Sequence, residues 1–213
     1  MEPIKEKFGS IEKATDVVLN FHGKKNVPGI YVGVYMLDFG LRKFYENFKE
    51  KENKEIKFNA VCETDFCLPD VLQALMHLTI GVRYLKIINF DGKFACTLYD
   101  RDDGKGIRVG INITKIDKEK FSDVYKFFTR TRKEHIVTED ARKRNNEEVI
   151  AQFMSMKEKD NLFSYKVVKV NFTGKEEKLP AKICKICRES FLSKEKDVCQ
   201  TCSGENKPYF TYL

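Results

Sequence analysis

Two closely spaced pairs of cysteines near the C-terminus are the residues of this 213-residue chain whose spacing most directly predicts chemistry. They are Cys184-Lys185-Ile186-Cys187 and Cys199-Gln200-Thr201-Cys202. A C-x-x-C pair can turn back on itself so that both sulfurs point to one position, and two such pairs supply the tetrahedral thiolate set that Zn²⁺ prefers. We therefore predict one structural zinc ion per chain, held by all four cysteines.

The segment around these cysteines is too small to be stabilised by a hydrophobic core of its own. Its apolar side chains are Ile183, Ile186, Phe191, Leu192 and Val198. Modules of fewer than about 40 residues usually need a metal or disulfides to fold. Structural zinc contributes on the order of 10 to 16 kcal/mol in comparable peptides. Two disulfides, a redox-active dithiol and a rubredoxin-type iron centre are the alternatives that the spacing leaves open.

The rest of the chain has the composition of an ordinary folded domain. Hydrophobic residues make up 42% of the sequence, with seventeen Phe and nine Tyr, which supports one domain of about 150 residues and a small appendage. No apolar run is long enough to span a membrane, and the start MEPIKEKFGS lacks the apolar stretch of a secretory signal. The odd number of seven cysteines suits a reducing compartment. We therefore expect a cytoplasmic protein without membrane contact.

The net charge of +7 permits a nucleic acid or another anionic partner. Basic residues exceed acidic ones locally between residues 126 and 144, by seven to three. We interpret this run as a solvated helical face, because charged runs on amphipathic helices usually face the solvent. Residues 181–213 hold six basic and four acidic residues, which equips the cysteine module weakly for phosphates. Nucleic-acid binding stays as an alternative, with strong salt dependence as its signature.

Helical periodicity and capping signals predict five helices that position these residues. Ser10 is expected to cap the first helix, and Pro28 suits the first position of the second. The second helix carries an apolar stripe. Its Gly33 and Gly40 predict a groove where another helix, within or between subunits, approaches closely; the alternative is two tolerated glycines in a long helix. The predicted ranges are 11–21, 28–48, 68 to about Gly81, 117–134 and 138–159.

Alternating apolar residues predict a mainly antiparallel sheet. The expected strands are 56–62, 84–90, 94–99, 107–113 and 164–170. Asp91-Gly92 is a two-residue hairpin signal, so the second to fourth strands are expected to form an antiparallel meander. The charged segment KEKENKE at 49–55 is interpreted as a linker.

We therefore expect an α+β fold, a mainly antiparallel sheet packed with helices, plus a small C-terminal treble-clef or zinc-ribbon-like module. Gly174, the charges after it and Pro180 mark a boundary. The predicted organisation is a core domain over 1–172, a linker over 173–182 and a four-cysteine zinc finger over 183–213.

Three short segments at the predicted ends of elements are richer in chemical groups than packing requires: 21–23, 26–29 and 63–67. His22 is a candidate metal ligand or proton carrier, or a satisfied core residue. Cys67 precedes a helix N-terminus, where a lowered pKa would favour a thiolate or a metal ligand; the alternative is a small buried hydrophobic residue. Asp65 and Asp70 are candidate acids or helix caps. Cys62 and Cys96 are assigned to core packing.

These segments resemble the FmdE family of formylmethanofuran dehydrogenase, whose signatures run F-H-G-H-x-C-P-G and E-T-D-x-C-x-x-D-x-x-Q. The first corresponds to Phe21-His22-Gly23-Lys24-Lys25-Asn26-Val27-Pro28-Gly29. The second is matched at every fixed position by Glu63-Thr64-Asp65-Phe66-Cys67-Leu68-Pro69-Asp70-Val71-Leu72-Gln73. A later stretch, Gly104-Lys105-Gly106-Ile107-Arg108-Val109, extends the resemblance over about residues 8 to 113. The C-terminal module resembles the zinc finger that some members carry.

The resemblance implies an α+β core, a treble-clef-like zinc finger, a homodimer, and association with a molybdenum or tungsten (molybdopterin) enzyme that reduces CO₂ onto methanofuran. The chain departs from the family at Lys24 and Val27, which replace the second His and the Cys, with one extra residue in the loop. A second, core metal would then have only His22 and Cys67. Those two ligands are too few for a closed site without Asp65, water or a second subunit.

We therefore predict an accessory protein with a pocketed core and a zinc finger that docks it to a larger redox enzyme or to its own partner subunit. The alternative is a stand-alone enzyme in which Cys67 is the thiolate, His22 the acid or base, and Asp65 a further catalytic group.

Overall fold

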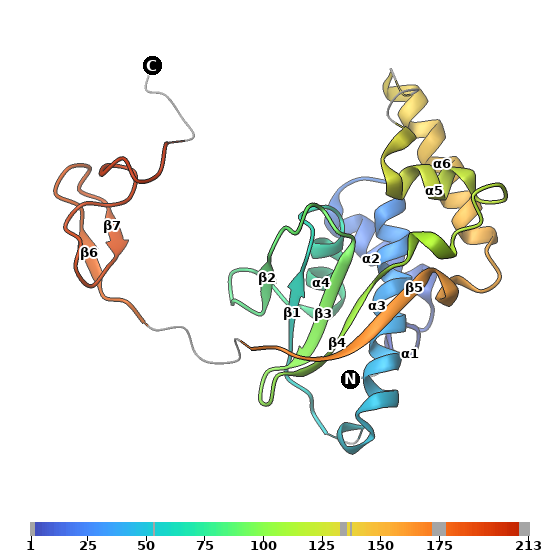
Figure 1. Cartoon of the computed structure of the whole chain (residues 1–213), viewed down its shortest axis with the longest axis horizontal. Helices are drawn as coiled ribbons and strands as arrows, with labels where there is room; N and C mark the ends of the chain where they lie inside the picture. Colours follow the sequence, from blue (N-terminus) through green and yellow to red (C-terminus); the bar gives the residue numbers. More distant parts are fainter. Residues whose placement is uncertain (1–2, 53, 133–135, 137, 172–177, 209–213) are drawn as a thin grey trace. The chain divides into compact units, whose positions relative to one another are not determined.

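A computed structural model of the chain describes residues 3–52, 54–132, 136, 138–171 and 178–208. By its internal contacts the chain divides into two compact units, Met1–Thr173 and Gly174–Leu213. Figure 1 traces both of them. We call them the core unit and the cysteine unit.

The core unit contains six α-helices in its described part. Ser10 caps α2 as predicted, because its Oγ accepts the N–H of Lys13 at 3.1 Å. The predicted stripe of α3 is buried from Ile30 to Phe48, which confirms the helical periodicity. The helices are α1 (Ile4–Phe8), α2 (Ile11–His22), α3 (Pro28–Asn47), α4 (Leu68–Met76), α5 (Ser122–Thr129) and α6 (Glu139–Ser155).

Three helices are shorter than predicted, and one of them, α6, ends at Ser155 and not near Lys159. α4 ends at Met76 because His77 adopts a left-handed conformation, and its N–H donates to the carbonyl of Gln73. α5 begins at Ser122, since the Asp117 carboxylate accepts backbone N–H groups in the preceding turn. It ends before Arg130, which is also left-handed, while the predicted end at Glu134 lies outside the described residues.

One five-stranded sheet, with three antiparallel pairings and one parallel pairing, confirms the predicted fold class. The predicted meander is wrong, because β2 pairs in parallel with β1 and not with β3. The chain passes through α4 between β1 and β2, the kind of crossover that parallel neighbours need. The sheet order is β2-β1-β3-β4-β5, with β1 (Phe58–Cys62), β2 (Leu85–Ile87), β3 (Ala95–Asp100), β4 (Lys105–Ile111) and β5 (Phe163–Lys169).

The Asp91-Gly92 turn forms, although the hairpin does not. Both residues have positive φ, 54° and 69°, and the N–H of Lys93 donates to the carbonyl of Phe90 at 3.1 Å. These are the angles that a type I′ turn requires. The turn therefore leads from β2 to β3 past β1, which lies between them in the sheet.

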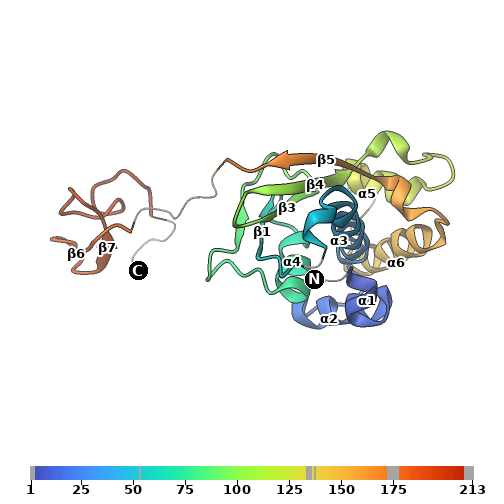
Figure 2. The same cartoon turned by 90° about the horizontal axis from the view of Figure 1, so that it is seen from below.

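Helices α3 and α4 pack against one face of the sheet, and α1 and α2 pack on these helices (Figure 2). Added Cβ atoms would lie 2.9 Å from Val71 of α4 at Gly33 and 3.2 Å from Val109 of β4 at Gly40. The predicted close approach is therefore confirmed for Gly33. At Gly40 the partner is a strand of the same chain, so neither glycine faces a neighbouring subunit.

The charged segment 49–55 is not simply a linker. Lys49–Lys51 form a 3-10 helix (η1), and Lys51 is 7% exposed. Its Nζ donates to Asp100 and, at 2.8 Å, to Asp103. Burial lowers the pKa of Lys51, but these two hydrogen bonds outweigh burial and the pKa is raised. A buried ion cluster thus ties this segment to the β3–β4 turn.

Two further 3-10 helices, η2 (Ile113–Lys115) and η4 (Lys159–Leu162), flank α5 and α6 in the core unit. The cysteine unit holds a two-stranded antiparallel sheet of β6 (Ala181–Ile183) and β7 (Ser190–Leu192), and no α-helix in its described part. No described helix of the chain combines the length and apolar character needed to cross a membrane.

Candidate metal centre and core cavity

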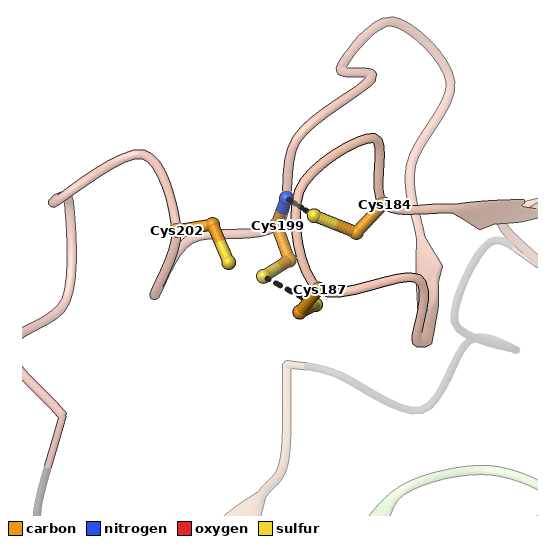
Figure 3. A group of neighbouring side chains, drawn as sticks. All are labelled: Cys184, Cys187, Cys199 and Cys202. Atoms are coloured by element: carbon orange, nitrogen blue, oxygen red, sulfur yellow. Dashed lines mark hydrogen bonds between the residues drawn. The ribbon is translucent and has the colours of Figure 1, made fainter. Parts of the chain in front are cut away.

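The four cysteines of the cysteine unit converge, with sulfurs that all lie within 4.8 Å of one another (Figure 3). The sulfurs of Cys187 and Cys199 are 3.9 Å apart. In a tetrahedral site with Zn–S bonds of about 2.3 Å, the sulfurs lie about 3.8 Å apart. All seven cysteines are free, which favours a metal site over the alternative of two disulfides. The geometry fits a tetrahedral metal ion such as Zn²⁺.

Backbone hydrogen bonds fold each pair into a tight turn. The first pair lies between β6 and β7, where the N–H of Arg188 donates to the carbonyl of Cys184 at 3.0 Å. Arg188 has a positive φ of 66°, which lets the chain reverse directly after the second sulfur. In the second pair, the N–H of Ser203 donates to the carbonyl of Cys199 at 2.9 Å.

The sulfurs influence one another electrostatically. The backbone N–H of Cys199 donates to the Cys184 sulfur at 3.4 Å, and this bond lowers the pKa of Cys184 to about 6. The neighbouring Cys199 sulfur, with the other two, raises the pKa of Cys202 to about 12. Four thiolates at this spacing repel each other, and a divalent cation removes that repulsion. The cluster therefore suits a cation better than it suits four free thiols.

The core unit contains a cavity of about 740 Å³. It lies at the end of the sheet where β1 ends, β3 begins and β4 ends. Two of the three segments singled out in the sequence line it, through Val27, Pro28 and Gly29 at the start of α3 and through Thr64, Phe66 and Cys67 before α4. The opposite wall comes from the end of α5 and from one residue of α6. The fold thus brings segments 26–29 and 63–67 to one place.

Cys67 is the N-cap residue of α4 and has an unusual backbone, with φ 47° and ψ −47°. Such a conformation costs on the order of 1–3 kcal/mol and persists only when its surroundings impose it. A Cβ on Gly29 would lie 2.8 Å from the Cys67 sulfur, so glycine is what allows α3 to approach. Burial, with a smaller effect of Asp70, raises the pKa of Cys67 to about 11. The expected lowering is therefore wrong, because burial and the Asp70 carboxylate both raise the pKa of Cys67.

The other candidate residues lie outside the cavity lining. His22 ends α2, and its Nδ1 is 2.5 Å from Oδ2 of Asp70 in the first turn of α4. Asp70 therefore pairs with His22, and neither Asp70 nor Asp65 caps α4. Asp65 is exposed and makes no hydrogen bond within the described part of the chain. Lys24 is exposed as well.

Of the three predicted catalytic residues, the structure thus places only Cys67 at the cavity. The described residues contain no second group of three or more metal-binding side chains close enough to share an ion.

Three arginines of the cavity wall were missed by sequence reasoning about the site. Arg108 of β4 makes two hydrogen bonds to the buried Glu63 carboxylate, at 2.6 and 2.7 Å. Arg130 and Arg132 belong to the charge run interpreted as a solvated face. Arg130 is exposed as that interpretation expects, although it also lines the cavity, whereas the half-buried Arg132 shows that the interpretation is wrong for that residue. The signal that could have found them is Phe127-Phe128, an aromatic pair followed within four residues by two arginines at a helix end.

The fold and the two sites define an α+β protein with a core cavity and a separate four-cysteine unit. The family model described as "FmdE, Molybdenum formylmethanofuran dehydrogenase operon" matches residues 21–164, a span that contains every residue of the cavity lining. The chain belongs to the FmdE family, which confirms the resemblance seen in the sequence.

A solved structure supports the same assignment. It is that of a tungsten formylmethanofuran dehydrogenase FmdE-like protein from Syntrophus aciditrophicus. The two chains are 26% identical, and the match has a TM-score of 0.70 and covers 94% of this chain and 95% of the other. None of the curated proteins matches this chain.

Proposed function

We propose that this protein is a zinc-binding accessory protein of a molybdenum- or tungsten-dependent enzyme of the formylmethanofuran dehydrogenase type, and that its core cavity binds a small molecule. The description of the matched family names the operon of the molybdenum enzyme, and the Syntrophus relative is named after the tungsten enzyme. The observation that carries the proposal is the cavity of about 740 Å³, whose lining includes two family-signature segments.

The state of Cys67 favours binding over covalent catalysis in this cavity. Burial raises the pKa of Cys67 to about 11, so the neutral thiol predominates at pH 7, whereas the thiolate is the nucleophile. His22 is paired with Asp70 and is absent from the lining. The cavity thus offers shape and charge to a ligand but no ionised nucleophile.

In the cysteine unit we propose a structural Zn²⁺ held by Cys184, Cys187, Cys199 and Cys202. Four protein ligands close the coordination shell, so the ion would cross-link the unit and leave no position for a substrate. We expect about one equivalent of zinc per chain by elemental mass spectrometry. Iron in its place, with the visible absorption of a rubredoxin-type centre, would contradict the zinc assignment.

The accessory role is tested by affinity capture of the tagged full-length chain from its native cell, after nuclease treatment, in the cytoplasmic fraction where we place it. Recovery of the catalytic chain of a molybdopterin enzyme, identified by mass spectrometry, is the expected result. A Cys184→Ser chain should recover less of it if the zinc unit makes the contact. Repeated captures without that enzyme would overturn the accessory role, and salt-sensitive recovery of nucleic acid would support the nucleic-acid alternative.

A stand-alone enzyme is the second candidate, and the His22–Asp70 contact is the observation that favours it, since a carboxylate fixes the orientation of an imidazole. Alkylation of Cys67 by iodoacetamide, followed by peptide mass spectrometry, separates the two candidates. Our proposal expects slow alkylation at pH 7 and a rate that rises about tenfold per pH unit towards pH 11. Fast alkylation at pH 7 that His22→Ala slows would support the enzyme.

The homodimer implied by the family resemblance stays a prediction. Edge strand β5 offers a surface for it, because Tyr165 and Val167 are 41% and 52% exposed. Light scattering after size-exclusion chromatography measures the mass directly. A mass of about 24.9 kDa, that of one chain, would rule out a stable dimer.

A further inference from the structure

We propose that the core cavity takes an organic anion, with a carboxylate or phosphate group on an apolar body, and that Arg130 and Arg132 recognise its charge. This inference rests on the small-molecule cavity of the proposed function and names the class of its ligand. The cavity lining carries more positive than negative side chains. Its basic residues are Lys93, Arg108, Arg130 and Arg132, and its acidic residue is Asp91.

Arg132 is a half-buried cation without an anionic partner among the described residues. Its guanidinium lies 4.4 Å from the centroid of the Phe127 ring. Its Nη1 donates to the neutral side chains of Asn146, at 2.8 Å, and Asn145, at 3.2 Å. Burial, with repulsion from Arg142, lowers the pKa of Arg132. Because an arginine has five N–H donors, several donors of this poorly solvated charge remain for a ligand.

Arg130 adds a second positive charge two residues earlier, on an exposed side chain that also lines the cavity. Its left-handed backbone, with φ 59°, ends α5, and its guanidinium lies 5.0 Å from the centroid of the Phe66 ring. No described carboxylate pairs with it. Arg108 differs from both, since Glu63 already holds its guanidinium by two hydrogen bonds. The lining therefore contains one neutralised arginine and two that are open to an external anion.

The N-terminus of α3 adds positive potential to the same cavity. This 20-residue helix has no side-chain cap and no acidic residue in its first turn. The N–H of Gly29, a residue of the lining, has no acceptor within the described part of the chain. Partial positive charge and free N–H groups at a helix N-terminus favour anions.

The remaining wall favours an apolar body on that anion. Phe94 and Phe127 both contact Phe128 edge-on, with ring centroids 5.5 and 4.9 Å apart. Ile111 and Ile113 continue this surface. Inorganic phosphate alone would leave this apolar surface exposed to solvent. An organic anion instead places its charged group at the arginines and covers the aromatic rings with its apolar part.

Three probes of similar shape test the proposal on the full-length, metal-loaded protein: 1-naphthoate, 1-naphthyl phosphate and the neutral 1-naphthamide. The chain has no Trp, so naphthalene fluorescence anisotropy can be followed without interference from indole. We expect at least one anion to bind about tenfold or more tightly than the amide, and the stronger of the two anions identifies the charged group. Arg132→Gln and Arg130→Gln should each reduce that preference, and the double variant should abolish it.

Arg144→Gln is the matched control, because Arg144 is exposed on α6 and outside the lining. It removes the same charge and should leave the preference unchanged. Thermal unfolding shows that each variant is folded, and the exposed Arg130 gives a variant that does not disturb the contacts of Arg132 with Asn145 and Asn146.

Equal affinity for the anions and the amide would overturn the inference while leaving a small-molecule cavity in place. The inference also fails if the double variant keeps the preference, if Arg144→Gln loses it equally, or if no anion binds. The accessory role itself is decided separately, by the affinity capture.

Discussion

The cysteine unit and the core cavity reach chemical function by opposite routes. The four sulfurs come from two short turns between residues 184 and 202 and meet within 4.8 Å. The cavity lining is drawn from segments spread between Val27 and Ser164. Metal ligands that are close in sequence can be recognised from their spacing. A cavity between segments that are distant in sequence forms only when the whole sheet is assembled, so sequence spacing does not reveal it.

The two units also differ in what stabilises them. Among the described buried apolar residues, the cysteine unit contributes Cys184 alone, and the core unit contributes all the others. In the cysteine unit, Ile183, Ile186 and Leu192 are 58–69% exposed. Burial of apolar surface therefore stabilises the core unit, while the cysteine unit needs its metal.

The largest effect expected from this difference is loss of the cysteine unit in Cys184→Ser. Removing one thiolate from a closed zinc site forfeits much of a binding energy that is on the order of 10 to 16 kcal/mol. We expect zinc to be lost and residues 178–208 to become protease-sensitive, while the thermal transition of the core unit is kept. Cys67→Ser, which removes a core cysteine, should retain one equivalent of zinc. Full zinc content in Cys184→Ser would show that the metal is bound elsewhere.

The second largest effect should come from Lys51→Met, which leaves the buried Asp100 without its cation. Breaking a buried ion pair from one side costs about 3–5 kcal/mol. Chemical denaturation should show this loss in the core unit, with the zinc content unchanged. Lys49→Met, at an exposed position of the same turn, serves as the control. A Lys51→Met protein as stable as the control would mean that the ion pair does not hold the β3–β4 turn.

The smallest effect concerns the contact between the two helix starts at the cavity. Gly29→Ala would place a Cβ 2.8 Å from the Cys67 sulfur, and overpacking of this kind costs about 1–3 kcal/mol. Gly81→Ala meets nothing within 4 Å and should be close to neutral. If both variants unfold at the same denaturant concentration, α3 and Cys67 do not pack as tightly as described.

Helices and the metal site could be predicted from the sequence because their signals are local. Ser10 caps α2, Pro28 begins α3, and the apolar stripe of α3 is buried, all as expected from residues three or four positions apart. The two C-x-x-C pairs are likewise local, because the spacing within each pair already places its two sulfurs close together.

The features that sequence did not reveal depend on distant partners. β2 lies beside β1 because α4 crosses between them, and Lys51 is buried because Asp100 and Asp103 meet it from the β3–β4 turn. Arg132 belongs to the cavity because β4, α5 and α6 surround it. For Lys51 and Arg132 the residue type alone favoured a solvent-exposed role.

The position of strand β5 in the chain also determines when the sheet of the core unit can be completed during protein synthesis. All seven residues of β4 find their partners on β5, from Lys105 with Lys169 to Ile111 with Phe163. A nascent chain that stops short of residue 163 therefore has β4 as an unprotected edge, open to pairing with other chains. Because β5 precedes Cys184 in the chain, translation makes the strand that covers β4 before it makes any of the four metal-binding cysteines.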